Sequence, residues 1–167
     1  MMQKRALRTV KTPALQTDEV VHFSLPGLLP DGQILALDTH LGTLSLLSSE
    51  QGMPRLLLQQ QFTTGELCML LPLLDCYPNY CPYEVLLASF TTGRVNERGV
   101  ERCRERLQEA QEAGVWDQEM RPVRNVLSRM RLKIRVFGLM DISSILETGY
   151  IILQTDQHAE SRLVVAW

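Results

Sequence analysis

The segment Arg121–Phe137, RPVRNVLSRMRLKIRVF, decides how the rest of the sequence is interpreted. It contains six basic residues and no acidic residue, whereas acidic and basic residues are mixed elsewhere in the chain. At about 100° per residue, its apolar side chains fall on one face of a helix. These side chains are Val123, Val126, Leu127, Met130 and Ile134. The pattern therefore predicts an amphipathic helix over residues 122–136.

The opposite face of this helix has the chemistry of a surface that reads duplex DNA. Small polar and apolar side chains occupy its centre, and cations run along both edges. In a major groove the cations can reach phosphates while the shorter side chains face base edges. An ordinary solvated basic face would give the same pattern, so that alternative stays open. The candidate contact residues are Arg121, Arg124, Asn125, Ser128, Arg129, Arg131, Leu132, Lys133 and Arg135.

Composition limits the class of protein. The chain has 167 residues, of which 45% are hydrophobic, so one domain with a substantial core is expected. The formal net charge is −2. This value argues against a general polyanion binder, and any contact with nucleic acid must use a local patch.

The sequence gives no reason to expect a metal, a cofactor or a membrane segment. The cysteines Cys68, Cys76, Cys81 and Cys103 lack the CxxC spacing of zinc sites, and the histidines lie far from them. No apolar run approaches the roughly 18 residues of a membrane span. The N-terminus is basic but lacks the apolar region of a signal peptide. We expect a cytoplasmic protein with a flexible basic leader over residues 1–19.

The first half of the chain predicts an antiparallel β-meander over residues 20–62. Its four short strand-like segments are separated by glycine and proline turns. The tetrad Thr63-Thr64-Gly65-Glu66 then has the form of a capping box that opens a helix. Pro72 lies inside the leucine-rich run that follows, and we expect it to kink or end that helix.

The second half is expected to form further helices and then strands. A second helix is expected at Tyr83–Phe90, and a third, highly charged helix at residues 97–113. The third helix has one narrow apolar stripe, which suits either a surface helix or a contact with another protein. Trp116–Met120 is interpreted as a linker, with Pro122 in the first turn of the basic helix. Residues 142–167 predict a hairpin and one further strand.

This order of elements closely resembles the winged helix-turn-helix of the OmpR/PhoB-type DNA-binding domain. The resemblance covers roughly residues 33–155. The residues that match the family's first helix are Phe62–Leu67, followed by Leu70 and Leu71. Those that match its second helix are Tyr83–Leu87, after Pro82. The recognition helix has Val123 followed by Leu127–Ile134, and the wing closes on Glu147-Thr148-Gly149-Tyr150.

The resemblance implies an α+β fold: a winged helix-turn-helix with an N-terminal meander, three to four helices and a C-terminal hairpin wing. It implies one domain over residues 20–167, with a helical part at 63–137. The function implied is sequence-specific binding of double-stranded DNA by a transcriptional regulator, with helix 122–136 in the major groove and Thr148, Gly149 and Tyr150 in the wing. RNA polymerase or another protein would contact helix 97–113, and a homodimer is a further expectation.

Three departures from the family pattern keep an alternative open. Ile145-Leu146-Glu147 is apolar and then acidic where family members commonly have a basic residue, and phosphates repel an acid. The segment before the recognition helix is longer than usual, and no receiver domain is expected before the module. The alternative is a winged-helix module that binds proteins. An enzyme is not expected, because no nucleophile motif or phosphate-binding glycine loop occurs.

Overall fold

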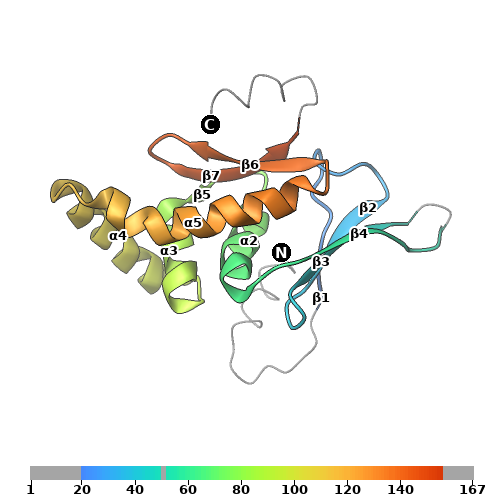
Figure 1. The fold of residues 1–167 in the computed structure, drawn as a ribbon, viewed down its shortest axis with the longest axis horizontal. Helices are drawn as coiled ribbons and strands as arrows, with labels where there is room; N and C mark the ends of the chain where they lie inside the picture. The colour runs from blue at the N-terminus through green and yellow to red at the C-terminus, as the bar shows by residue number, and fades with distance from the viewer. Residues whose placement is uncertain (1–19, 50–51, 156–167) are drawn as a thin grey trace.

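The computed structural model describes residues 20–49 and 52–155. Figure 1 shows a β-meander at one end, a group of helices beside it, and a C-terminal hairpin along the long helix α5. The α+β class, with its meander, four helices and hairpin, is confirmed. The expected leader and the expected strand at Arg162–Trp167 lie outside the described residues.

The meander forms as the alternating sequence predicts. Its strands are β1 (Val20–Phe23), β2 (Gln33–Asp38), β3 (Thr43–Ser48) and β4 (Arg55–Gln61), and they pair antiparallel in chain order. Leu35 and Leu37 of β2 and Leu44 of β3 are completely buried. At the β2–β3 turn, the Asp38 carboxylate accepts hydrogen bonds from two backbone N–H groups. One face of the sheet thereby contributes to the common core.

Helix α2 (Thr64–Cys76) begins with the predicted capping box. The Glu66 N–H donates to Thr63 Oγ1 at 3.2 Å, and the Thr63 N–H donates to Glu66 Oε1 at 2.8 Å. Of the two outcomes expected for Pro72, a kink or an end of the helix, the second is wrong, because α2 continues to Cys76. Proline at position 72 cannot donate to the Cys68 carbonyl four residues earlier. The buried Ser89 hydroxyl of α3 donates to that carbonyl instead, at 2.5 Å.

Helices α3 (Tyr83–Thr92) and α4 (Glu97–Glu112) follow, so the inserted third helix is confirmed. Gly93 ends α3 in the left-handed conformation, with φ of 69°. Asn96 caps α4 by accepting a hydrogen bond from the Gly99 N–H at 2.7 Å. Cys103 and Leu107 lie on the buried side of α4, which packs against α3. The remainder of α4 is largely exposed, as a charged surface helix requires.

Helix α5 (Trp116–Arg135) is longer than the sequence pattern indicated. The expected linker at Trp116–Met120 is helical, and the Val115 carbonyl accepts hydrogen bonds from the N–H groups of Gln118 and Glu119. Met120 is fully buried, so the apolar face extends one turn earlier than expected. Pro122 therefore lies inside the helix and not in its first turn.

The C-terminal hairpin consists of β6 (Met140–Ile145) and β7 (Gly149–Gln154). The two-residue strand β5 (Cys81–Pro82), which the sequence did not predict, pairs with β7 and gives the order β5-β7-β6. A Cβ atom on Gly149 would collide with the Cys81 carbonyl, so this contact requires glycine. The hairpin is thereby attached to the segment between α2 and α3.

Candidate nucleic-acid interface

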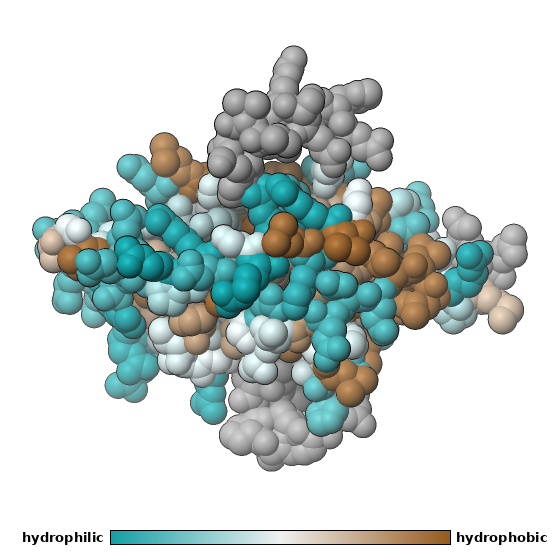
Figure 2. Space-filling view, in the orientation of Figure 1, coloured by the Kyte–Doolittle hydropathy of each residue, from teal (hydrophilic) through white to brown (hydrophobic). Residues whose placement is uncertain are grey.

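The outward face of α5 carries most of the predicted contact residues. Six of them are exposed: Arg121, Asn125, Ser128, Arg129, Leu132 and Arg135. Figure 2 shows hydrophilic surface over much of the helical part and apolar surface toward the meander. Four basic residues of α5 form ion pairs, and these pairs range from exposed to buried.

Arg131 does not belong to the exposed face. Its guanidinium binds the Asp141 carboxylate through two hydrogen bonds, of 2.9 and 3.1 Å. The side chains of Arg131 and Asp141 are only 11% and 9% exposed. The sequence placed Arg131 at a phosphate-binding edge. That expectation is corrected, because the guanidinium is buried and bonded to Asp141 of β6.

Asp141 also joins a second arginine. Its carboxylate accepts hydrogen bonds of 3.2 Å from Arg135 and one of 2.8 Å from the Ile142 N–H. Burial alone would raise the pKa of Asp141, but the hydrogen bonds from Arg131 and Arg135 outweigh it and the pKa is lowered. The Arg135 side chain is 43% exposed, so it remains accessible to a second anion.

Lys133 also forms an ion pair within the protein. Its Nζ lies 2.6 Å from Glu66 Oε1 and 5.4 Å from the centre of the Phe62 ring. Burial would raise the pKa of Glu66, but the hydrogen bonds from Lys133 and Thr63 lower it. This partner, Glu66, lies in the first turn of α2. Lys133 therefore connects α5 to the capping box of α2.

Arg124 is held less firmly. It forms a 3.0 Å ion pair with Asp117, whose side chain is 77% exposed, and lies 4.9 Å from the centre of the Trp116 ring. An exposed pair of this kind contributes only about 0–1 kcal/mol. The Ser128 hydroxyl donates to the Arg124 carbonyl at 2.9 Å. Arg124 can therefore exchange Asp117 for another anion at little cost.

Arg121 and Arg129 have no ion-pair partner within residues 20–49 and 52–155, and Asn125 lies on the surface between them. Four of the six cations of the basic segment pair with three carboxylates, namely Asp117, Glu66 and Asp141. The basic segment and these partners thus retain three net positive charges. Glu119, near the start of α5, is paired with Arg106 of α4.

The predicted wing residues Thr148, Gly149 and Tyr150 are all buried or half-buried. Gly149 contacts β5, and the Tyr150 ring packs 5.8 Å from that of Tyr83, centre to centre. The exposed tip is instead formed by Leu146, which is 87% exposed, and Glu147, whose φ is 59°. Glu147 thus adopts the left-handed conformation that glycine favours.

Within the described residues there is no cluster of His, Cys, Asp and Glu side chains that could hold a metal ion. None of the described helices is long and apolar enough to cross a membrane. Comparison with protein-family models, with curated proteins and with solved structures found no match. The order of strands and helices is compatible with the OmpR/PhoB-type topology.

Proposed function

We propose that this protein binds double-stranded DNA in a sequence-specific manner, with α5 in the major groove, and that it regulates transcription. The observation that carries the proposal is the outward face of α5. There Arg121 and Arg129 flank Asn125, and no carboxylate in the described part of the chain neutralises either arginine. Such a face combines phosphate contacts with a side chain that can read a base edge.

The accessible residues are assigned distinct roles. Asn125 can form two hydrogen bonds with adenine, and the exposed Leu132 can contact a thymine methyl group. Phosphates are contacted by the accessible cations Arg121, Arg124, Arg129 and Arg135. Arg131 and Lys133 are removed from the contact set, since their ion pairs fix the position of α5 against β6 and α2.

The proposal is tested with single variants and a library of random duplexes. We expect Arg129→Gln to weaken binding to all sequences and to reduce the salt slope by about 1, as for one lost phosphate contact. We expect Asn125→Ala to change the preference between sequences at one base position. Arg102→Gln is the matched control, because Arg102 is an exposed arginine of α4. Equal binding by Arg129→Gln and Arg102→Gln would contradict the proposal.

The second candidate function is a winged-helix module that binds another protein. It is favoured by three exposed apolar side chains: Leu132 at 66%, Val136 at 55% and Leu146 at 87%. Leu132 and Val136 are four residues apart at the end of α5, and adjacent exposed apolar groups are characteristic of protein interfaces. This alternative predicts DNA binding that is weak at low salt and insensitive to ionic strength, so a salt titration separates the two functions.

A further inference from the structure

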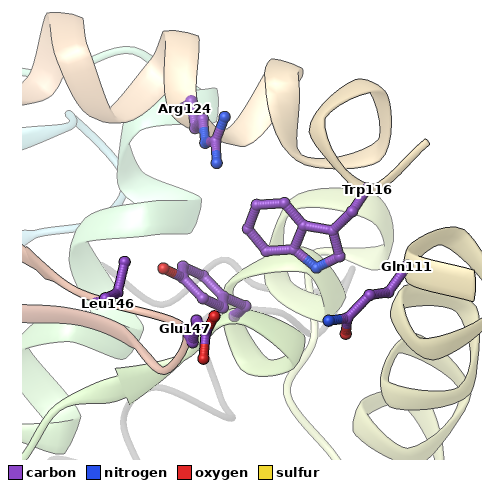
Figure 3. A pocket seen from close by; sticks show the side chains of 6 residues that line it. Gln111, Trp116, Arg124, Leu146 and Glu147 are labelled. Carbon is purple, nitrogen blue, oxygen red and sulfur yellow. The ribbon is translucent and has the colours of Figure 1, made fainter. Parts of the chain in front are cut away.

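A pocket of about 300 Å³ lies where the start of α5, the end of α4 and the hairpin tip meet (Figure 3). Its volume is at the lower end of the range for small-molecule sites, roughly 300–1,000 Å³. Most of the exposed α5 face lies outside this pocket. Its lining residues are Tyr83, Gln111, Trp116, Arg124, Leu146 and Glu147.

Aromatic rings form a fixed apolar wall of this pocket. Tyr83 meets Trp116 edge to face, with ring centres 5.0 Å apart and planes at 75°. On its other side Tyr83 packs against Tyr150, and its hydroxyl donates to the Ile145 carbonyl at 3.3 Å. Burial, reinforced by Tyr150, raises the pKa of Tyr83, so the hydroxyl stays protonated at neutral pH. A flat ring can pack against this wall, face-on to one ring and edge-on to the other, without rearranging it.

Opposite charges lie on different walls of the pocket. Figure 3 shows Arg124 reaching in from α5, while Glu147 extends from the hairpin tip on the opposite side. The two side chains form no ion pair with each other, and Glu147 has no ion-pair partner within residues 20–49 and 52–155. The exposed amide of Gln111 supplies a third polar group.

We propose that this pocket binds a small aromatic zwitterion of the aromatic amino acid class. The ligand ring packs against the wall formed by Trp116 and Tyr83, its carboxylate binds Arg124, and its ammonium group binds Glu147. Charge-assisted hydrogen bonds of this kind are the strongest polar contacts available to a small ligand. An ammonium group beside the aromatic wall gains a further attraction. The proposal does not depend on DNA binding.

The surroundings of Arg124 and Glu147 favour a ligand that carries both a negative and a positive charge. The Asp117 partner of Arg124 is 77% exposed, so a ligand carboxylate displaces only a weak surface pair. A simple anion would be repelled by Glu147, and a simple cation would be repelled by Arg124. Only a zwitterion satisfies both walls together.

The test compares three probes of nearly equal shape: L-phenylalanine, 3-phenylpropanoate and 2-phenylethylamine. The chain has two tryptophans, so a Trp167→Phe background makes Trp116 the sole fluorescent indole. Titration of its fluorescence should give a dissociation constant on the order of 1 mM or tighter for L-phenylalanine. Each single-charge probe should bind at least about tenfold more weakly, because each lacks one charge-assisted contact.

Two pocket variants test which side chain binds each charged group of the ligand. In the same background, Arg124→Gln should remove the preference for L-phenylalanine over 2-phenylethylamine, and Glu147→Gln should remove its preference over 3-phenylpropanoate. Arg98→Gln, at an exposed position of α4, is the control and should bind all three probes normally. Circular dichroism checks that each variant is folded. Absence of saturable binding, equal binding of the three probes, or affinities unchanged in both pocket variants would overturn the proposal.

Discussion

Asp141 is the residue on which the position of α5 depends most directly. Its buried carboxylate joins Arg131, Arg135 and the Ile142 N–H. Removal of its charge leaves the guanidinium of Arg131 buried without a counterion, which costs several kcal/mol. We expect Asp141→Asn to lower the free energy of unfolding by about 2–4 kcal/mol, measured by urea denaturation. A loss under about 0.5 kcal/mol, the range of ordinary surface substitutions, would contradict this role.

The same substitution has a defined pH dependence. The pKa of Asp141 is lowered in the folded protein. Its contribution to stability is therefore complete above the ordinary carboxyl value near 4 and is lost as the pH falls through the lowered pKa. Stability measured by urea unfolding should thus decline on acidification less steeply in Asp141→Asn than in the wild type. Some decline remains, because the pKa of Glu66 is lowered as well. Identical slopes would refute the assignment.

At the residue scale, helical periodicity identified the buried apolar face correctly. It could not show which basic side chains are exposed and which are held in ion pairs. Val123, Val126, Leu127, Met130 and Ile134 are all buried, as predicted. Arg131 and Arg129 are two positions apart, yet one is buried in an ion pair and the other is exposed. The difference depends on Asp141, which belongs to the next strand. For Lys133 the partner is 67 positions away in the chain. Periodicity within one helix contains no information about such partners.

At the scale of the elements, two helices contain an internal proline and accommodate it differently. Pro72 of α2 is buried, and the Ser89 hydroxyl binds the Cys68 carbonyl that would otherwise lack this helical hydrogen bond. Pro122 of α5 is exposed, and the corresponding carbonyl belongs to Gln118, also an exposed residue. Water can serve a carbonyl on the surface, but the steric cost of the ring remains.

The position of Pro122 leads to a prediction about helix stability. Alanine is about 3 kcal/mol more favourable than proline inside a helix. Proline also restricts the unfolded chain, so its replacement stabilises the unfolded state by about 1 kcal/mol and offsets part of this gain. We expect Pro122→Ala to stabilise the protein by about 1–2 kcal/mol, seen as a higher melting temperature. Gln118→Ala provides a comparison without the proline effect and should change stability by less than about 0.5 kcal/mol. Destabilisation by Pro122→Ala would show that the proline is required where it lies.

The elements themselves were predictable wherever the local signal was long or chemically specific. The alternating segments gave the meander, and the Thr63–Glu66 tetrad gave the start of α2. Strand β5 was missed, because two residues cannot show a period. The start of α5 was placed too late, because Pro122 was assumed to mark a first turn. Met120, buried in the core, shows that the apolar face already included that turn.

At the scale of the whole molecule, α5 is placed by elements on both of its sides. Figure 1 shows the hairpin along one side of α5 and helices α2 and α3 along the other. The ion pairs of Arg131 and Lys133 reach these two neighbours, and the buried side chains of the meander, helices and hairpin form one core. Only the outward face of α5 is left for a partner. The fold class followed from the order of elements, whereas this orientation required the long-range pairs.

The charge distribution of the whole molecule gives the last prediction. The net charge of −2 gives no general attraction to DNA, so binding must come from the accessible cations of α5. Four phosphate contacts, by Arg121, Arg124, Arg129 and Arg135, correspond to a slope of log K against log salt between about −3 and −4. We expect the double variant Arg121→Gln/Arg129→Gln to reduce the slope to about −2.

The matched control changes the net charge equally on another helix. Arg98→Gln/Arg102→Gln removes two exposed arginines from α4. If α5 is the DNA contact, this variant should retain the wild-type slope in fluorescence anisotropy titrations of a labelled duplex. If both double variants lose affinity equally, attraction is diffuse and no groove contact by α5 is needed. A wild-type slope near zero would favour the protein-binding module, since apolar contacts by Leu132 and Val136 do not release counterions.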